Sequence, residues 1–166
     1  DRSNVQFKSQ YAVIRMQLGD YETALRLFDE LLSDIPGEPV TLTSKGHALK
    51  TIGRTADAIA CYREACRDGV IHGEAWQSLG NLKTYRFDEA DIERMQKLLT
   101  VPTLRSIDKV YLHFALGKAL EDFGRVDDAF RMYEKGNAIK RSESRYVAQH
   151  MTEAVSYTHL RAHETS

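Results

Sequence analysis

A phrase of eleven residues that returns at a fixed distance is the feature of this sequence that most restricts its fold. It reads LGDYETALRLF from residue 18 and IGRTADAIACY from residue 52, so Gly19 and Gly53 are 34 residues apart (53 − 19). It returns as FGRVDDAFRMY from residue 123, where Gly124 lies 71 residues beyond Gly53 (124 − 53), or 34 plus 37. A period of this length is typical of folds that stack one small unit on the next. The sequence therefore predicts four units, over 5–38, 39–72, 73–109 and 110–143, the third enlarged and irregular.

Each phrase has the chemistry of a turn between two antiparallel helices. Gly19, Gly53 and Gly124 stand where the first helix must end in a backbone conformation that favours glycine. Acidic residues follow each glycine closely, and they suit the start of a second helix by capping and by the helix dipole. In each second helix an alanine is followed four residues later by an aromatic residue. The pairs are Ala24/Phe28, Ala58/Tyr62 and Ala129/Tyr133. We expect these pairs to face the neighbouring helix.

Glycines also recur inside the first helices, at Gly46, Gly80 and Gly117. Glycine in a helix interior costs up to about 1 kcal/mol relative to alanine, so we expect a large side chain from a neighbouring helix to occupy the space. The stretch WQSLG at Trp76–Gly80 resembles the W-x-x-L-G opening of the tetratricopeptide repeat (TPR). This resemblance implies an all-α fold, a right-handed solenoid of antiparallel helical hairpins.

The tail after residue 143 divides into two parts. Tyr146, Val147, His150 and Met151 form an apolar stripe with helical spacing, so we expect a capping helix, or the start of a linker to a further domain, over 144–155. Residues 156–166 resemble translated adaptor sequence and are expected to be non-native. The natural protein is then expected to continue beyond this chain.

Composition restricts the classes of partner. The formal net charge is −1 and 42% of the residues are hydrophobic, which predicts a folded domain without the basic field that nucleic acid or an anionic membrane requires. Cys61 and Cys66 are spaced so that neither can bridge the other within one helix, and they are expected to be small buried hydrophobic residues. Free thiols indicate a reducing compartment, so we expect a cytoplasmic location.

No motif for catalysis or metal binding stands out. His159 and His163 have the four-residue spacing of zinc ligands on a helix, but the H-E-x-x-H order is absent and both lie in the expected non-native tail. No nucleophile paired with a base and no glycine-rich nucleotide loop occurs. We therefore expect no catalytic, metal or cofactor residue in this chain.

Binding is the class of function that the repeat favours, because stacked hairpins form a concave wall from their first helices. That wall would accept a protein or peptide. The predicted groove residues are His47, Lys50, Gln77, Asn81, Thr84, Tyr85, Tyr111, Phe114, Lys118, Glu121 and Asp122.

A closer resemblance covers residues 5–155. The stretches NLKT at 81–84, HFALGKALED at 113–122 and YEKGNAIKR at 133–141 resemble the repeat region of bacterial TPR sulfotransferases. In that family a catalytic domain follows the repeats and takes a sulfonyl group from phosphoadenosine phosphosulfate (PAPS). The family's phosphosulfate loop is not found here, so the resemblance implies a non-catalytic N-terminal arm and places PAPS only in the parent protein. A stand-alone peptide-binding adaptor, similar to a co-chaperone, and a self-associating structural fragment remain the alternatives.

Overall fold

The chain is built of helices throughout the part that can be described. The computed structural model describes the backbone of residues 2–164 and the side chains of residues 4–152. Residues 2–164 form eight helices and no strand. The helices are α1 (Arg2–Gln17), α2 (Tyr21–Asp34), α3 (Pro39–Thr51), α4 (Thr55–Ala65), α5 (Gly73–Gly80), α6 (Glu89–Leu99), α7 (Ser106–Asp122) and α8 (Val126–Glu164).

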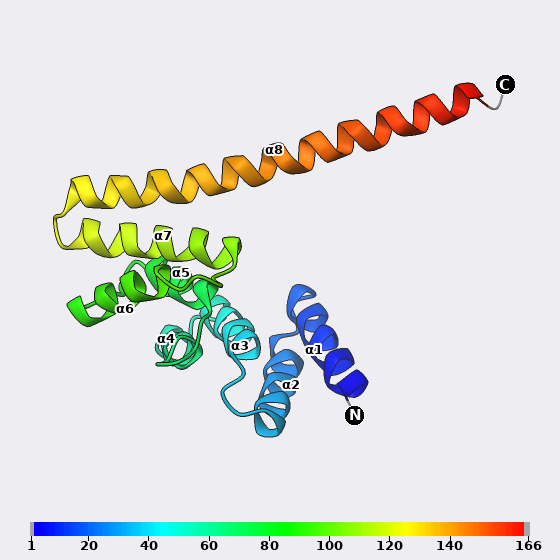
Figure 1. The fold of residues 1–166 in the computed structure, drawn as a ribbon. Helices are drawn as coiled ribbons and strands as arrows, with labels where there is room; N and C mark the ends of the chain where they lie inside the picture. The colour runs from blue at the N-terminus through cyan, green and yellow to red at the C-terminus, as the bar shows by residue number, and fades with distance from the viewer. Residues whose placement is uncertain (1, 165–166) are drawn as a thin grey trace.

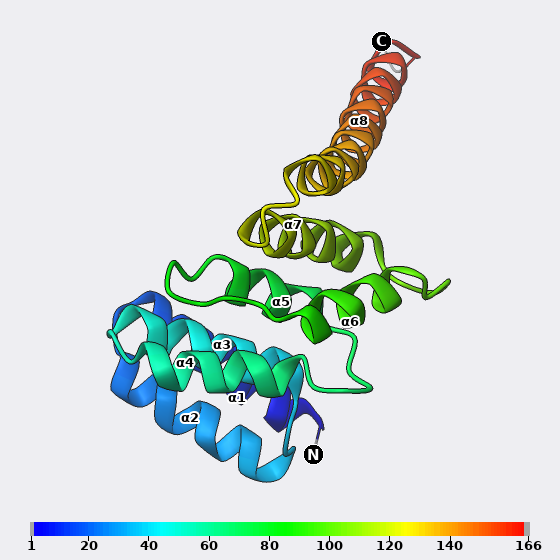
Figure 2. The same ribbon diagram turned by 90° about the vertical axis from the view of Figure 1, so that its left-hand side faces the viewer.

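The helices stack in chain order. α1 packs against α2, α3 against α4, and α7 against α8, while α2 contacts α3 and α4 contacts α5. Figures 1 and 2 show the result, a pile with α1 and α2 at one end and α8 at the other. The prediction of an all-α stack of helical hairpins is confirmed. None of the described helices is both long enough and apolar enough to cross a bilayer.

The three turn glycines have the predicted conformation. Gly19, Gly53 and Gly124 have φ angles of +83°, +84° and +74°. At each turn the glycine N–H and the next residue's N–H donate back to carbonyls of the preceding helix, as in Gly53 to Lys50 at 3.1 Å and Arg54 to Leu49 at 2.9 Å. This is the Schellman pattern, which satisfies helix-end carbonyls and reverses the chain. The repeated phrase therefore encodes the same turn three times.

The acidic residues after these glycines differ in their role. The Asp20 side chain caps α2 by accepting from the Thr23 N–H at 3.1 Å. Asp57 and Asp127 lie within the first turns of α4 and α8, where they suit the helix dipole. Asp57 does not cap α4, because the N-cap position is held by Arg54, which makes no capping hydrogen bond through its side chain.

The glycines inside the first helices make room for rings, as predicted. A Cβ atom on Gly46 would collide with the Tyr62 ring, and one on Gly117 would lie 2.6 Å from Cε1 of Tyr133. The contact at Gly80 is looser, because its Cβ would lie 3.4 Å from Cε2 of Phe87. Two hairpins therefore close by inserting a tyrosine ring over a glycine.

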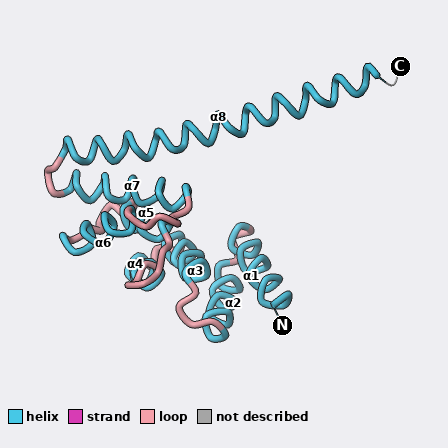
Figure 3. Tube along the Cα trace, viewed as in Figure 1, coloured by secondary structure: helices cyan, strands magenta, loops and turns pink. Residues whose placement is uncertain are grey.

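The third unit is opened out. α5 is only 8 residues long, and no Cα atom of α5 lies within 8 Å of a Cα atom of α6. The loops flanking α5 and α6 are longer than the three-residue turns of the other hairpins (Figure 3). Trp76, which is fully buried, fills the wider space with its ring 6.0 Å from that of Phe87 and 4.9 Å below the guanidinium of Arg94.

The separate helix expected after residue 143 is not formed, since residues 126–164 make one continuous helix. The reason is local: this stretch contains no proline and its one glycine, Gly136, is tolerated because it packs against α7. Tyr146, Val147 and Met151 are exposed, so their stripe does not cover the stack. The side chains of residues 153–166, which include the predicted non-native tail and the His159/His163 pair, lie outside the described residues.

Candidate functional site

The predicted groove residues lie on three helices and one loop. His47 and Lys50 are on α3, Gln77 is on α5, and Asn81, Thr84 and Tyr85 lie in the loop that follows it. The remaining five are on α7. Each of the eleven is exposed or half-buried, so each is accessible to a partner.

His47 joins the second unit to the third. Its Nδ1 accepts a hydrogen bond from the Tyr62 hydroxyl at 2.8 Å, which leaves Nε2–H to donate to Oε1 of Glu74 at 3.2 Å. The hydrogen bond from His47 holds the pKa of Glu74 below its ordinary value of 4.5. Burial raises the pKa of Tyr62 to about 12, so its hydroxyl remains a donor. One buried tyrosine thus fixes a histidine and a carboxylate at the surface.

The helix that carries Glu74, α5, packs against α7. A Cβ on the neighbouring Gly73 would lie 3.0 Å from Cβ of Tyr111, so α5 and α7 are in close contact here. Burial raises the pKa of Tyr111, and the nearby carboxylate of Glu74 adds to the rise. Along α7, Tyr111 is followed by Phe114, Lys118 and Glu121 at helical spacing on one face. These residues form what we call the first-helix strip, namely His47, Glu74, Tyr111, Phe114, Lys118 and Glu121.

The C-terminal end of the first-helix strip combines rings and charges. The Tyr133 hydroxyl donates to Oε2 of Glu121 at 2.8 Å, and its ring centroid lies 6.3 Å from that of Phe114. Lys118 pairs with Asp122 at 2.5 Å, and the ammonium of Lys140 lies 5.8 Å from the Phe114 ring centroid. Burial raises the pKa of Tyr133, and so does its bond to Glu121.

Tyr85 lies apart from the strip. Its hydroxyl accepts a hydrogen bond from Arg63 of α4 at 3.0 Å, and its ring meets Phe87 edge-on at 5.2 Å. Arg63 also pairs with the buried Asp91 of α6 at 2.7 Å. The loop after α5 therefore turns Tyr85 toward the second helices, because the longer third unit has no turn glycine to reverse the chain after α5.

Five of the predicted residues keep their polar groups unpaired. Lys50, Gln77, Asn81, Thr84 and Tyr111 make no side-chain hydrogen bond or ion pair within residues 4–152. Their amide, hydroxyl and ammonium groups can be satisfied by water or by a partner. Such groups next to fixed rings and charges suit recognition of a protein segment.

Two contributors to the strip were missed by sequence reasoning, the hydroxyls of Tyr62 and Tyr133. The pairing of a ring with a small residue predicts that each ring packs inward. It does not show that a tyrosine lying over Gly46 or Gly117 extends far enough to place its hydroxyl beside His47 or Glu121. The signal in the sequence was the residue type at this position. The first unit fills it with Phe28, which is buried, whereas Tyr62 and Tyr133 carry a hydroxyl that needs a partner.

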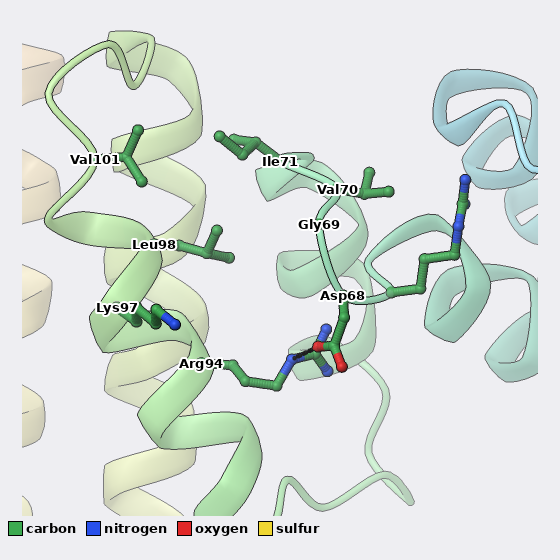
Figure 4. A pocket seen from close by; sticks show the side chains of 9 residues that line it. Asp68, Gly69, Val70, Ile71, Arg94, Lys97, Leu98 and Val101 are labelled. Atoms are coloured by element: carbon green, nitrogen blue, oxygen red, sulfur yellow. Dashed lines mark ion pairs between the residues drawn. The ribbon is translucent and has the colours of Figure 1, made fainter.

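A separate hollow of about 390 Å³ lies between α6 and the loop after α4. Leu98 of α6 points toward the loop that carries Val70 and Ile71 (Figure 4). Arg94 at its rim pairs with Asp68 at 2.8 Å and donates to the Cys66 carbonyl at 2.5 Å, so this guanidinium is held by the fold. None of the eleven predicted residues lines this hollow.

The two cysteines are buried, as predicted. Burial raises the pKa of both thiols, that of Cys66 to about 11. A thiol that stays protonated at neutral pH is a poor nucleophile and a poor metal ligand. Within the described side chains, no three His, Cys, Asp or Glu residues are grouped to hold a metal ion.

Comparisons with known proteins agree with this architecture. The family model described as "Tetratricopeptide repeat" matches residues 41–67, which span most of the second hairpin. The chain is similar to the crystal structure of MamA, with a TM-score of 0.58 and 18% identity over 88% of this chain and 84% of that one. It is also similar to the MamA RS-1 ArsTM double mutant, with a TM-score of 0.54 and 21% identity over 86% of this chain and 79% of that one.

These similarities establish the fold, a TPR-like stack of helical hairpins. The two MamA structures share too little sequence with this chain to carry more than the fold. No curated protein matches it. Neither the family model nor the similar structures point to a sulfotransferase.

Proposed function

We propose that this chain is a protein-interaction module that binds a peptide or helical segment of a partner protein along the first-helix strip. A TPR-like fold is suited to protein partners because its stacked first helices present side chains from several units to one ligand. The observation that supports this site is the hydrogen bond from His47 to Glu74 of α5, beside which Gly73 lies close to Tyr111 of α7. These contacts bring residues that are far apart in sequence into one continuous surface.

The strip's chemistry restricts the partner. Tyr111 and Phe114 offer half-buried rings, and aromatic side chains contribute much of the binding energy in protein interfaces. Lys118 and Glu121 carry opposite charges, and the local field has no single sign. We therefore expect a segment that carries apolar anchors with both charges, rather than a polyanion.

Binding along the strip is tested by substitutions at two predicted groove residues on the same first helices, Lys50 of α3 and Gln77 of α5, that leave the fold intact. Lys50→Glu with Gln77→Arg changes two side chains that make no described hydrogen bond, so folding should be unaffected. We expect this double variant to weaken binding of a partner captured by the wild-type chain by at least about tenfold, which is roughly 1.4 kcal/mol. The matched control is Glu93→Lys with Lys97→Glu on α6, which alters two exposed charges away from the strip. Equal binding by both variants and the wild type would contradict the assignment.

A second proposal, that this module is the N-terminal arm of a PAPS-dependent sulfotransferase, rests on the sequence resemblance alone. Gly136, part of that resemblance, also has a packing reason here, because its Cβ would lie 3.3 Å from His113 Cβ and Phe114 Cζ. The test is the reading frame of the gene downstream of residue 155. A sulfotransferase domain with its phosphosulfate loop supports the proposal, whereas a stop codon or an unrelated domain ends it in favour of a stand-alone adaptor.

The location proposed for the module is the cytoplasm. Cys61 and Cys66 are unpaired thiols, and an oxidising compartment would expose them to disulfide exchange whenever the chain unfolds. Fractionation of cells that express the gene would test this, and recovery of the protein from a secreted fraction would contradict it.

A further inference from the structure

The exposed face of α1 consists of positions that are covered in later units. Phe7, Tyr11 and Ile14 are 70%, 41% and 50% exposed. With the offsets of 34, 34 and 37 residues that relate Ala12, Gly46, Gly80 and Gly117, their equivalents can be read directly. Phe7 corresponds to Thr41, Ala75 and Leu112, Tyr11 to Lys45, Leu79 and Leu116, and Ile14 to Ala48, Leu82 and Ala119. All nine are buried except Lys45, which is half-buried.

These positions are covered because each first helix packs on the unit before it. Ala48 belongs to the apolar cluster of the first hairpin, together with Phe28 and Leu31 of α2. Lys45 forms an ion pair at 2.6 Å with Asp29 of α2. The same face of α1 therefore has the composition of an inter-unit contact, with no preceding unit among the described residues to cover it.

The face of α8 that turns away from α7 is the complementary half. Phe130 occupies the position of Leu25 and Ile59 (59 − 25 = 34 and 130 − 59 = 71). Leu25 contacts the apolar clusters of both the first and the second unit, and so bridges them. Phe130, in contrast, is 62% exposed. The last hairpin thus presents a larger apolar side chain than its equivalents, with nothing described that covers it.

The polar residues of the two faces also match. Glu134 occupies the position of Asp29 (134 − 29 = 105, or 34 plus 71), and Tyr11 that of Lys45. A contact of the Asp29–Lys45 kind between the two faces would set the Glu134 carboxylate against the Tyr11 hydroxyl. The guanidinium of Arg15 lies 5.9 Å from the Tyr11 ring centroid and is itself paired with Asp20.

We propose that the α1 face of one molecule docks on the α8 face of a second copy, so that the stack continues from chain to chain. We assign a second copy as the occupant because this chain carries both halves of the interface. The two faces lie at opposite ends of the pile (Figure 2). Their residues are equivalent in the repeat to those that join α2 to α3. Such a contact is heterologous, and it leaves one free face at each end. Assembly can therefore proceed beyond a dimer.

Three single substitutions test the proposal by sedimentation velocity over a range of concentrations. We expect the wild type to associate as concentration rises, and Phe7→Glu or Phe130→Glu to raise the dissociation constant by at least about tenfold. Leu18→Glu is the matched control, since Leu18 is exposed and so are its equivalents Ile52 and Phe123. It should associate as the wild type does. Circular dichroism and thermal melting verify that each variant folds.

A mixture of the Phe7→Glu and Phe130→Glu variants tests directly whether the two faces bind each other. Phe7→Glu retains a good α8 face and Phe130→Glu a good α1 face, so an equimolar mixture should form a dimer that grows no further, while each variant alone stays monomeric. A wild type that is monomeric at its highest soluble concentration would overturn the proposal. So would variants that associate unchanged, or a mixture that stays monomeric.

Discussion

The Tyr62 hydroxyl donates to Nδ1 of His47 at 2.8 Å, so that a fully buried ring of a second helix fixes a histidine on the surface of a first helix. The ring reaches this position because Gly46 has no side chain to obstruct it. The packing of Tyr62 over Gly46 therefore also determines the position of His47, a candidate binding residue. Variants that disturb this packing should also change the position of His47.

Removing that hydroxyl tests the link. Tyr62→Phe keeps the ring and leaves Nδ1 of His47 unpaired, so we expect the free energy of unfolding to fall by about 1 kcal/mol in urea titrations. A double-mutant cycle with His47→Ala should give a coupling energy of similar size. Tyr146→Phe, at an exposed position on α8, is the control. Strict additivity of the two substitutions would show that the hydrogen bond contributes nothing.

The glycines inside the first helices should differ in their tolerance of alanine. Gly46→Ala forces the Tyr62 ring to move, and overpacking of this kind costs about 1–3 kcal/mol. Gly80→Ala meets only a 3.4 Å contact at the last residue of α5, so its net effect should stay within about 1 kcal/mol of zero. Chemical denaturation of the two variants side by side decides this. Equal losses would mean that the ring is not tightly seated over Gly46.

Stability should depend on pH through buried histidine. His72 bonds to the Thr43 hydroxyl at 2.9 Å, and burial lowers its pKa below the ordinary value of 6.5. Burial also lowers the pKa of His113. The unfolded chain takes up protons as the pH falls through about 6.5, whereas the folded chain takes them up only at lower pH. The free energy of unfolding should therefore be at its full value above 6.5 and decrease as the pH falls from there toward the lowered pKa values.

Denaturation at pH 7.5 and at pH 5.5 measures this decrease, in a range where carboxylates remain ionised. Replacing His72 by Asn should remove its share of the slope. A flat profile for the wild type would contradict the assignment of neutral buried histidines.

The thiols should be protected by the fold. Cys61 and Cys66 are buried and burial raises both pKa values, so a thiol reagent at pH 8 should react slowly with the native chain and rapidly with both cysteines in denaturant. Absorbance of the released thiolate follows the reaction. Fast labelling of the native chain would show that α4 opens far more readily than its packing indicates.

The sequence predicts best what repeats. Gly19, Gly53 and Gly124 recur with the same neighbours, and each forms the same turn because the local backbone requirement is the same. Two features depend instead on contacts between distant residues: the turn of Tyr85 toward Arg63, and the hydroxyl bonds of Tyr62 and Tyr133. The apolar stripe near residue 147 has the spacing of a helix, but spacing alone does not show whether that helix is new or continues the one before it. Here it continues α8.

A site-specific cross-link to the partner shows directly whether the partner lies along the first helices. A photoreactive phenylalanine derivative is introduced at Gln77, beside the first-helix strip, or at Glu93 on α6, and the chain is irradiated with the partner bound. Binding along the first helices predicts that the partner is cross-linked from position 77 and not from position 93. Cross-linking from position 93 alone, or equally from both, would contradict binding along the first helices.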